Sequence, residues 1–171
     1  MKTKVLLAML LFTVSIASYS QISKVEIVAT GLTCSMCSNA INKQLKALAE
    51  VEKVTTDLNT NTFTVELKKG SKISPLRLKQ SVEKAGFYVG SMTLTITLDK
   101  PNLDDNLSTA INDDTYVFVD ADSKTLSEVI TAKVLDKGFV TPKEYKKLSK
   151  SMSKYPTYDA GNANTFHLKL T

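Results

Sequence analysis

The hydrophobic pattern between residues 24 and 98 changes its period repeatedly, and this limits the fold more than any other feature. Apolar residues alternate at Val25, Ile27 and Ala29, as in a half-buried strand. From Cys37 they recur at every third or fourth residue, as in an amphipathic helix. The same criteria predict further strands at 51–58, 62–67 and 88–98, and a second helix at 75–85. The order β-α-β-β-α-β predicts an α+β, ferredoxin-like sandwich with two helices on one face of a four-stranded antiparallel sheet.

The N-terminus has the composition of a secretory signal peptide. A basic start at Lys2 and Lys4 precedes an almost unbroken apolar run from Val5 to Ala17. That run is short for a bilayer-spanning helix, which disfavours an uncleaved anchor. Small residues at 17–20 offer a cleavage site. We therefore expect residues 1–20 to be removed and the chain to be periplasmic or extracytoplasmic, without stable membrane insertion.

Charge and cysteine content exclude several classes of protein. The formal net charge of +5 includes Lys2 and Lys4, so the exported chain carries +3. This modest charge does not indicate a nucleic-acid partner. The chain has two cysteines, which is too few for a small domain stabilised mainly by disulfides, so folding must depend on a hydrophobic core.

The second half of the chain has a different composition. Residues 99–114 are rich in Pro, Asn and Asp and are predicted to be a linker. Residues 115–171 are predicted to form a small β-α-α-β region of unknown role, either a companion domain or an elaboration packed on residues 21–98. Its expected elements are a strand at 115–119, helices at 123–136 and 142–152, and a strand at 165–170.

Both cysteines lie in the stretch Gly31-Leu32-Thr33-Cys34-Ser35-Met36-Cys37, which joins the first strand to the first helix, with Cys34 in the loop just before that helix. Paired thiolates favour soft ions, with Cu(I) first and Hg(II) as an alternative. Cys37 is placed in the first helical turn, where the positive end of the helix dipole stabilises thiolates. Two ligands also leave space for a third from a partner protein.

This stretch resembles the Gly-Met-Thr-Cys-x-x-Cys signature of heavy-metal-associated (HMA) domains, which form copper chaperones, N-terminal domains of copper ATPases and periplasmic mercury-binding proteins. The resemblance covers about residues 22–97, and Ala85-Gly86-Phe87 is similar to the family's Gly-Phe loop. Leu32 replaces the usual methionine, a packing substitution that should cost under about 1.5 kcal/mol. The resemblance implies a metal carrier, scavenger or sensor rather than an enzyme. It also implies Cys34 and Cys37 as ligands, and a metal-transporting or metal-accepting partner.

Other metal ligands are less favoured. Zinc prefers four ligands in structural sites, and the single histidine, His167, lies in a predicted strand and is more often structural in such a position. Met36 is expected to point outward, because thioethers are weak donors. Met92 and Met152 are isolated in the sequence and form no methionine-rich cluster.

Two other uses of the cysteine pair remain open. An interaction protein of the cell envelope can carry a structural disulfide between Cys34 and Cys37, although so short a loop gains little from closure. A thioredoxin-like thiol-disulfide oxidoreductase also places Cys-x-x-Cys at a helix start. The predicted hairpin after the first helix, the absence of tryptophan before Cys34 and the lack of a proline at a strand start all disfavour it.

Charged stretches in the second half are interpreted as solvated surface. Asp120 and Asp122 resemble the first ligands of a calcium loop, but Thr125 and Thr131 occupy the positions where that loop needs glycine and glutamate. A basic stripe at Lys143, Lys146, Lys147, Lys150 and Lys154 is more typical of a solvated helix face than of a docking site for an acidic partner or an anionic membrane.

Overall fold

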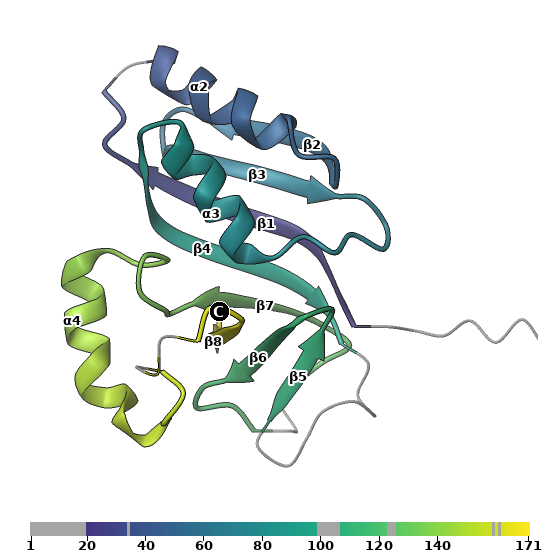
Figure 1. Cartoon of the computed structure of the whole chain (residues 1–171), viewed down its shortest axis with the longest axis vertical. Coiled ribbons are helices and arrows are strands. Elements are labelled where there is room, and N and C mark those ends of the chain that lie inside the picture. The colour runs from purple at the N-terminus through teal and green to yellow at the C-terminus, as the bar shows by residue number, and fades with distance from the viewer. Residues whose placement is uncertain (1–19, 34, 99–106, 123–125, 159, 161) are drawn as a thin grey trace, which may run out of the picture.

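A computed structural model describes residues 20–33, 35–98, 107–122, 126–158, 160 and 162–171. The first half has the predicted order of elements (Figure 1), and the α+β, ferredoxin-like fold is confirmed. Its elements are β1 (Gln21–Thr30), α2 (Ser35–Lys46), β2 (Val51–Asp57), β3 (Thr62–Leu67), α3 (Pro75–Lys84) and β4 (Tyr88–Thr97).

Both helices of this half cover one face of the sheet (Figure 1). Helix α2 buries Ile41 and Leu45 completely, as its apolar period predicts. Helix α3 begins at the predicted cap, where the Ser74 side chain accepts a hydrogen bond from the Leu76 amide at 3.3 Å and proline takes the first helical position. Local sequence chemistry therefore places both helices where the sequence analysis put them.

The second half continues the same sheet. Its elements are β5 (Ser108–Ile111), β6 (Asp114–Phe118), β7 (Val129–Val134), α4 (Pro142–Ser151), a 3₁₀ turn η2 (Met152–Lys154) and β8 (Thr165–Leu170). Strand β7 pairs antiparallel with β4, and the resulting eight-stranded sheet has the order β2-β3-β1-β4-β7-β8-β6-β5. One hydrophobic cluster spans both halves, so residues 107–171 elaborate the first half.

The helix predicted at 123–136 is wrong, because Val129–Val134 is strand β7; residues 123–125 lie outside the described residues. The apolar positions fit a helical period, but Ile130, Ala132 and Val134 also alternate, and these three are buried. β-branched residues favour the extended form, and the open edge of β4 supplies a pairing partner.

The linker predicted at 99–114 is also wrong where the structure describes it. Residues 99–106 lie outside that part of the chain, but Ser108–Ile111 is strand β5, which forms a hairpin with β6. Asn112 turns this hairpin with a positive φ of 56°, which asparagine tolerates. The polar residues that indicated a linker are thus turn residues. The predicted helix beginning after Thr141 and the final strand are confirmed.

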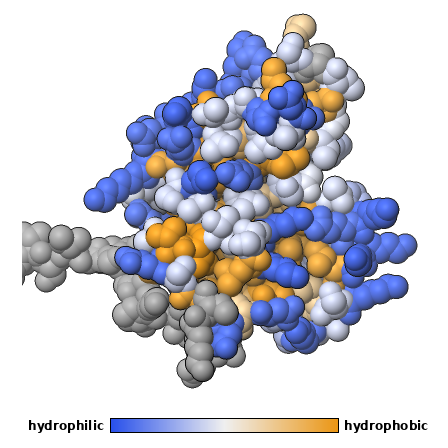
Figure 2. Space-filling view, turned by 180° about the vertical axis from the view of Figure 1, so that it is seen from behind, coloured by the Kyte–Doolittle hydropathy of each residue, from blue (hydrophilic) through white to orange (hydrophobic). Residues whose placement is uncertain are grey.

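Helix α4 lies on the sheet face opposite to α2 and α3. Lys133 of β7 is directly opposite Thr93 of β4, on the face that does not contact α2 and α3. Lys133 Nζ lies 2.6 Å from the Glu144 carboxylate of α4. Tyr145 and Leu148 of α4 pack on a second, smaller core, and Figure 2 shows the molecule from this side.

The predicted signal peptide at residues 1–20 lies almost wholly outside the described residues, so it stays a prediction. None of the helices in the described ranges has the length and apolar character needed to span a bilayer.

Candidate metal centre

The predicted metal loop begins where β1 ends at Thr30. Gly31 has a φ of +87°, which side-chain-bearing residues rarely adopt, so the chain turns sharply at this position. A Cβ at Gly31 would lie 3.9 Å from Phe87 Cδ1, which places the Ala85-Gly86-Phe87 loop beside the metal loop. Leu32 is partly buried and packs against the main core, in agreement with its interpretation as a packing substitution.

Cys37 lies in the first turn of α2 and is half-buried. Met36, which precedes it, is 80% exposed, as predicted for an outward-pointing side chain. Cys34 lies outside the described residues, so its pairing with Cys37 in one site stays a prediction.

The electrostatics around Cys37 favour an anionic sulfur. The first turn of α2 contains no acidic residue, and the helix places Lys43 and Lys46 in its last turn. The positive end of the helix dipole therefore faces the loop without a competing side-chain carboxylate from that turn. Among the described residues, no group of three or more His, Cys, Asp or Glu side chains is arranged to hold a metal ion.

His167 is a structural residue. It is fully buried in β8, with Nδ1 2.8 Å from Asp136 Oδ1 and Nε2 2.8 Å from Thr157 Oγ1. Both ring nitrogens are therefore engaged, and neither is available to a metal. Met92 and Met152 are each buried in a hydrophobic cluster.

The turn between β2 and β3 lies beside the metal loop. The Ala29 amide donates to the Asn61 carbonyl at 3.1 Å, which ties this turn to the end of β1. Leu58 and Asn61 of the turn and Ser38 of α2 help to line a depression of about 280 Å³ next to Leu32. Within the turn, the Asn59 amide and then the Thr60 hydroxyl hold the pKa of Asp57 below its ordinary value.

Exposed apolar side chains gather around this loop, and of these only the exposure of Met36 was predicted from the sequence. Met36, Leu58 and Tyr88 are 80%, 57% and 70% exposed, and each lies on a segment that adjoins the loop. Leu58 was predicted as the last residue of a strand, but β2 ends at Asp57 and leaves it in the turn. Periodicity alone gives no signal for such exposure, because these residues lie at the ends of elements.

Comparison with known proteins identifies the class of this domain. Residues 27–88 match the family model of the heavy-metal-associated domain. The chain is similar to the yeast copper transporter domain Ccc2a, solved in apo and Cu(I)-loaded states, with 35% identity over 38% of this chain and 88% of that one and a TM-score of 0.35. The chain belongs to the heavy-metal-associated domain family through this segment.

Two further solved structures are similar over the same part of the chain. One is the Cu(I)-loaded N-terminal domain of a potential copper-translocating P-type ATPase from Bacillus subtilis, with 30% identity over 40% of this chain and 85% of that one and a TM-score of 0.37. The other is the Atx1-Cu(I)-Ccc2a complex, with 34% identity over 39% of this chain and 90% of the matched chain and a TM-score of 0.35. A comparison with curated proteins gave no match.

Proposed function

We propose that this protein binds one Cu(I) ion between Cys34 and Cys37 and passes it to a partner protein outside the cytoplasm. The observation that carries the proposal is the position of Cys37. It lies in the first turn of α2, after a loop turned by Gly31, within a segment that matches the heavy-metal-associated domain.

Ligand chemistry supports Cu(I) as the cargo. Thiolates select soft ions, and Cu(I) accepts coordination by two sulfurs. The N-terminus of α2 stabilises the negative charge of a bis-thiolate complex. The yeast domain, 35% identical over the matched part of this chain, was solved in apo and Cu(I)-loaded states, and the Bacillus subtilis domain, 30% identical, in the Cu(I)-loaded state. Hg(II) has the same preference for thiolates and is the alternative cargo.

Transfer to a partner follows from the low coordination number. A thiolate of the partner adds to the metal as a third ligand, and a thiolate of this protein then leaves. The complex of two proteins around Cu(I) among the similar structures supports a metal-accepting partner of this kind. Sequestration or sensing would use the same site.

The two competing uses of the cysteines have less support. A thioredoxin-like enzyme needs a crossover to a parallel strand after the helix, whereas α2 is followed by the β2–β3 hairpin. A purely structural disulfide does not account for the family match over residues 27–88.

Export is proposed from the composition of residues 1–20, as argued from the sequence. Cell fractionation of the tagged full chain checks it. We expect the protein in the extracytoplasmic fraction at the mass of a chain that begins near Gln21. Full-length protein in the cytoplasmic fraction would contradict export without affecting the proposal for the metal.

Titration of the reduced protein with Cu(I) against a competing chelator tests the metal site. We expect one equivalent to bind, and the double variant Cys34→Ser/Cys37→Ser to lose at least about 100-fold in affinity, because hydroxyl oxygens are hard ligands. Met36→Leu is the matched control, since it changes the exposed sulfur between the cysteines and should bind as the wild type does. Equal binding by the double variant would refute the site, and insulin reduction that depends on Cys34 would favour the oxidoreductase.

A further inference from the structure

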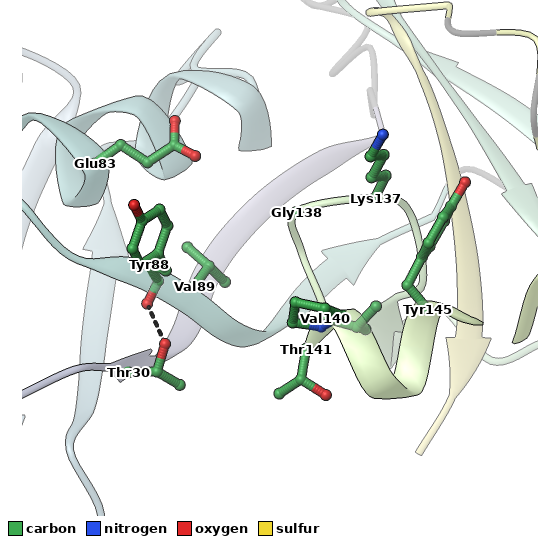
Figure 3. A pocket seen from close by; sticks show the side chains of 10 residues that line it. Thr30, Glu83, Tyr88, Val89, Lys137, Gly138, Val140, Thr141 and Tyr145 are labelled. Atoms are coloured by element: carbon green, nitrogen blue, oxygen red, sulfur yellow. Dashed lines mark hydrogen bonds between the residues drawn. The ribbon is translucent and has the colours of Figure 1, made fainter. Parts of the chain in front are cut away.

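A cleft lies next to the metal loop, between the heavy-metal-associated domain and the C-terminal elaboration. One wall is formed by Thr30, Glu83 and Tyr88, and the other by Lys137 and Tyr145, with Val89 and Val140 between them (Figure 3). Its volume is about 420 Å³, within the range of about 300–1,000 Å³ in which proteins bind small groups. The apolar floor and the two tyrosine rings make it a site for an apolar side chain.

The cleft adjoins the predicted metal loop directly. Thr30 is the last residue of β1 and is followed by Gly31, where that loop begins. The Thr30 hydroxyl donates to the Tyr88 carbonyl at 3.3 Å, which holds the end of β1 against the start of β4. A molecule seated in the cleft therefore also lies against the end of the domain that carries Cys37.

The second wall is held in place by contacts with α3 and β4. Gly138 has a φ of +83°, a conformation that residues with a side chain rarely adopt, and it lies against the side chain of Lys79 of α3. Val140 forms a bridge with Ser91 of β4. The cleft is thus formed where segments distant in the sequence meet.

A lysine face on α4 extends this surface and consists of Lys143, Lys146, Lys147 and Lys150. All four are exposed, and their spacing places them on the side of the helix away from its packing residues. Lys146 is one turn from Pro142, which lines the cleft. The face extends about 10 Å along the helix at 1.5 Å per residue, beyond the reach of a small molecule held in the cleft.

The charge around the cleft is positive. Its two nearby acidic residues are already paired, Glu83 with Lys79 at 2.8 Å and Glu144 with Lys133 at 2.6 Å. Lys137 is exposed, and neither it nor the lysine face forms an ion pair with a described residue. Electrostatic complementarity therefore favours an acidic occupant.

We propose that the cleft and the lysine face form a docking site for a segment of a partner protein that carries an apolar side chain flanked by carboxylates. The apolar side chain enters the cleft between Tyr88 and Tyr145, and the carboxylates contact Lys137 and Lys146. Docking there brings the partner against the metal loop. That this partner is also the acceptor of the metal rests on the proposed function.

The test uses the full exported chain and a capped peptide with one phenylalanine between pairs of glutamates, followed by amide chemical shifts in NMR. We expect saturable shifts at Val89, Gly138 and Val140. The variant Lys137→Glu/Lys146→Glu should bind about tenfold more weakly, because two charge reversals together are worth about 1.4 kcal/mol. Lys69→Glu, an exposed lysine after β3 at the opposite end of the domain, is the control and should bind normally.

Two further peptides separate the contributions of charge and shape. Replacement of the phenylalanine by serine should abolish the shifts in the cleft, and replacement of the glutamates by lysines should abolish binding. Absence of binding, equal binding of the serine peptide, or equal weakening by Lys69→Glu would overturn the docking site. Tyr88→Ser should weaken peptide binding and leave Cu(I) affinity unchanged. Failure of Cu(I) binding in the wild type would refute the metal proposal alone.

Discussion

Replacement of Ile130 by alanine tests whether the two halves of the chain unfold as one unit. Ile130 in β7 is directly opposite Ile96 in β4, where the C-terminal elaboration joins the metal-binding half. Ile130 is 5% exposed and Ile96 is fully buried. The substitution therefore removes buried apolar contact at the junction of the two halves and changes no polar group.

The magnitude follows from the buried volume. At about 0.8 kcal/mol for each buried carbon, loss of the side chain beyond Cβ costs about 2.4 kcal/mol. The residual cavity brings the total to about 3 kcal/mol, or a fall in Tm of about 6–12 °C for a chain of this size. If the sheet unfolds as one unit, residues of the metal-binding half lose the same free energy as β7.

Hydrogen exchange of individual amides measures this free energy in each half separately. We expect the amides of Val25 and Val65, on the far strands β1 and β3, to lose about 3 kcal/mol of protection together with those of β7. Val129→Ala is the matched control, since its side chain is 54% exposed and the change should stay within about 0.5 kcal/mol. Unchanged protection of β1 and β3 in Ile130→Ala would show two independent units and refute the shared core.

Two further predictions concern buried polar groups. Burial raises the pKa of Asp114 above its ordinary value of 3.8, so the protonated form is favoured in the folded state, and the stability this brings is lost as the pH rises through the folded pKa. Asp114→Asn should therefore be more stable than the wild type at pH 7 and lose this advantage below about pH 3.8, as urea denaturation at several pH values will show. A smaller advantage at pH 7 than at low pH would contradict the assigned cause. His167→Ala should cost about 3 kcal/mol in urea denaturation at pH 7, because it removes two ring hydrogen bonds and leaves a cavity beside Asp136. Lys169→Ala, an exposed change in the same strand, is its control, and equal stability of the two variants would show that the buried histidine contributes nothing.

The elements of residues 21–98 could be predicted because their signals are local. A hydroxyl before Pro75 caps α3, a strict alternation defines β3, and a helical apolar period that starts at Cys37 marks the beginning of α2. Each of these signals extends over a few residues and does not depend on contacts with distant parts of the chain. The same is true of Thr141, which caps α4 as predicted.

The segment at 123–136 could not be predicted in this way. Its apolar residues fit a helical period, which led to the wrong prediction of a helix, but those from Ile130 to Val134 fit an extended period as well. The extended form is stabilised by pairing with the free edge of β4, which forms backbone hydrogen bonds with Val129–Val134 and allows Ile130 to be buried in the core. A contact between strands far apart in the chain outweighed the local pattern.

The candidate sites divide in the same way. The sequence by itself predicted the metal loop, because two thiols at close spacing before a helix are a signal for soft-metal binding that can be read from neighbouring residues. The docking cleft was decided by the tertiary structure alone, since Tyr88 and Tyr145 line the same pocket only after β7 has paired with β4 and Gly138 has packed on α3. Ligands that are close together in the sequence can be predicted from their spacing. A cleft between distant segments forms only when long-range strand pairing brings those segments together.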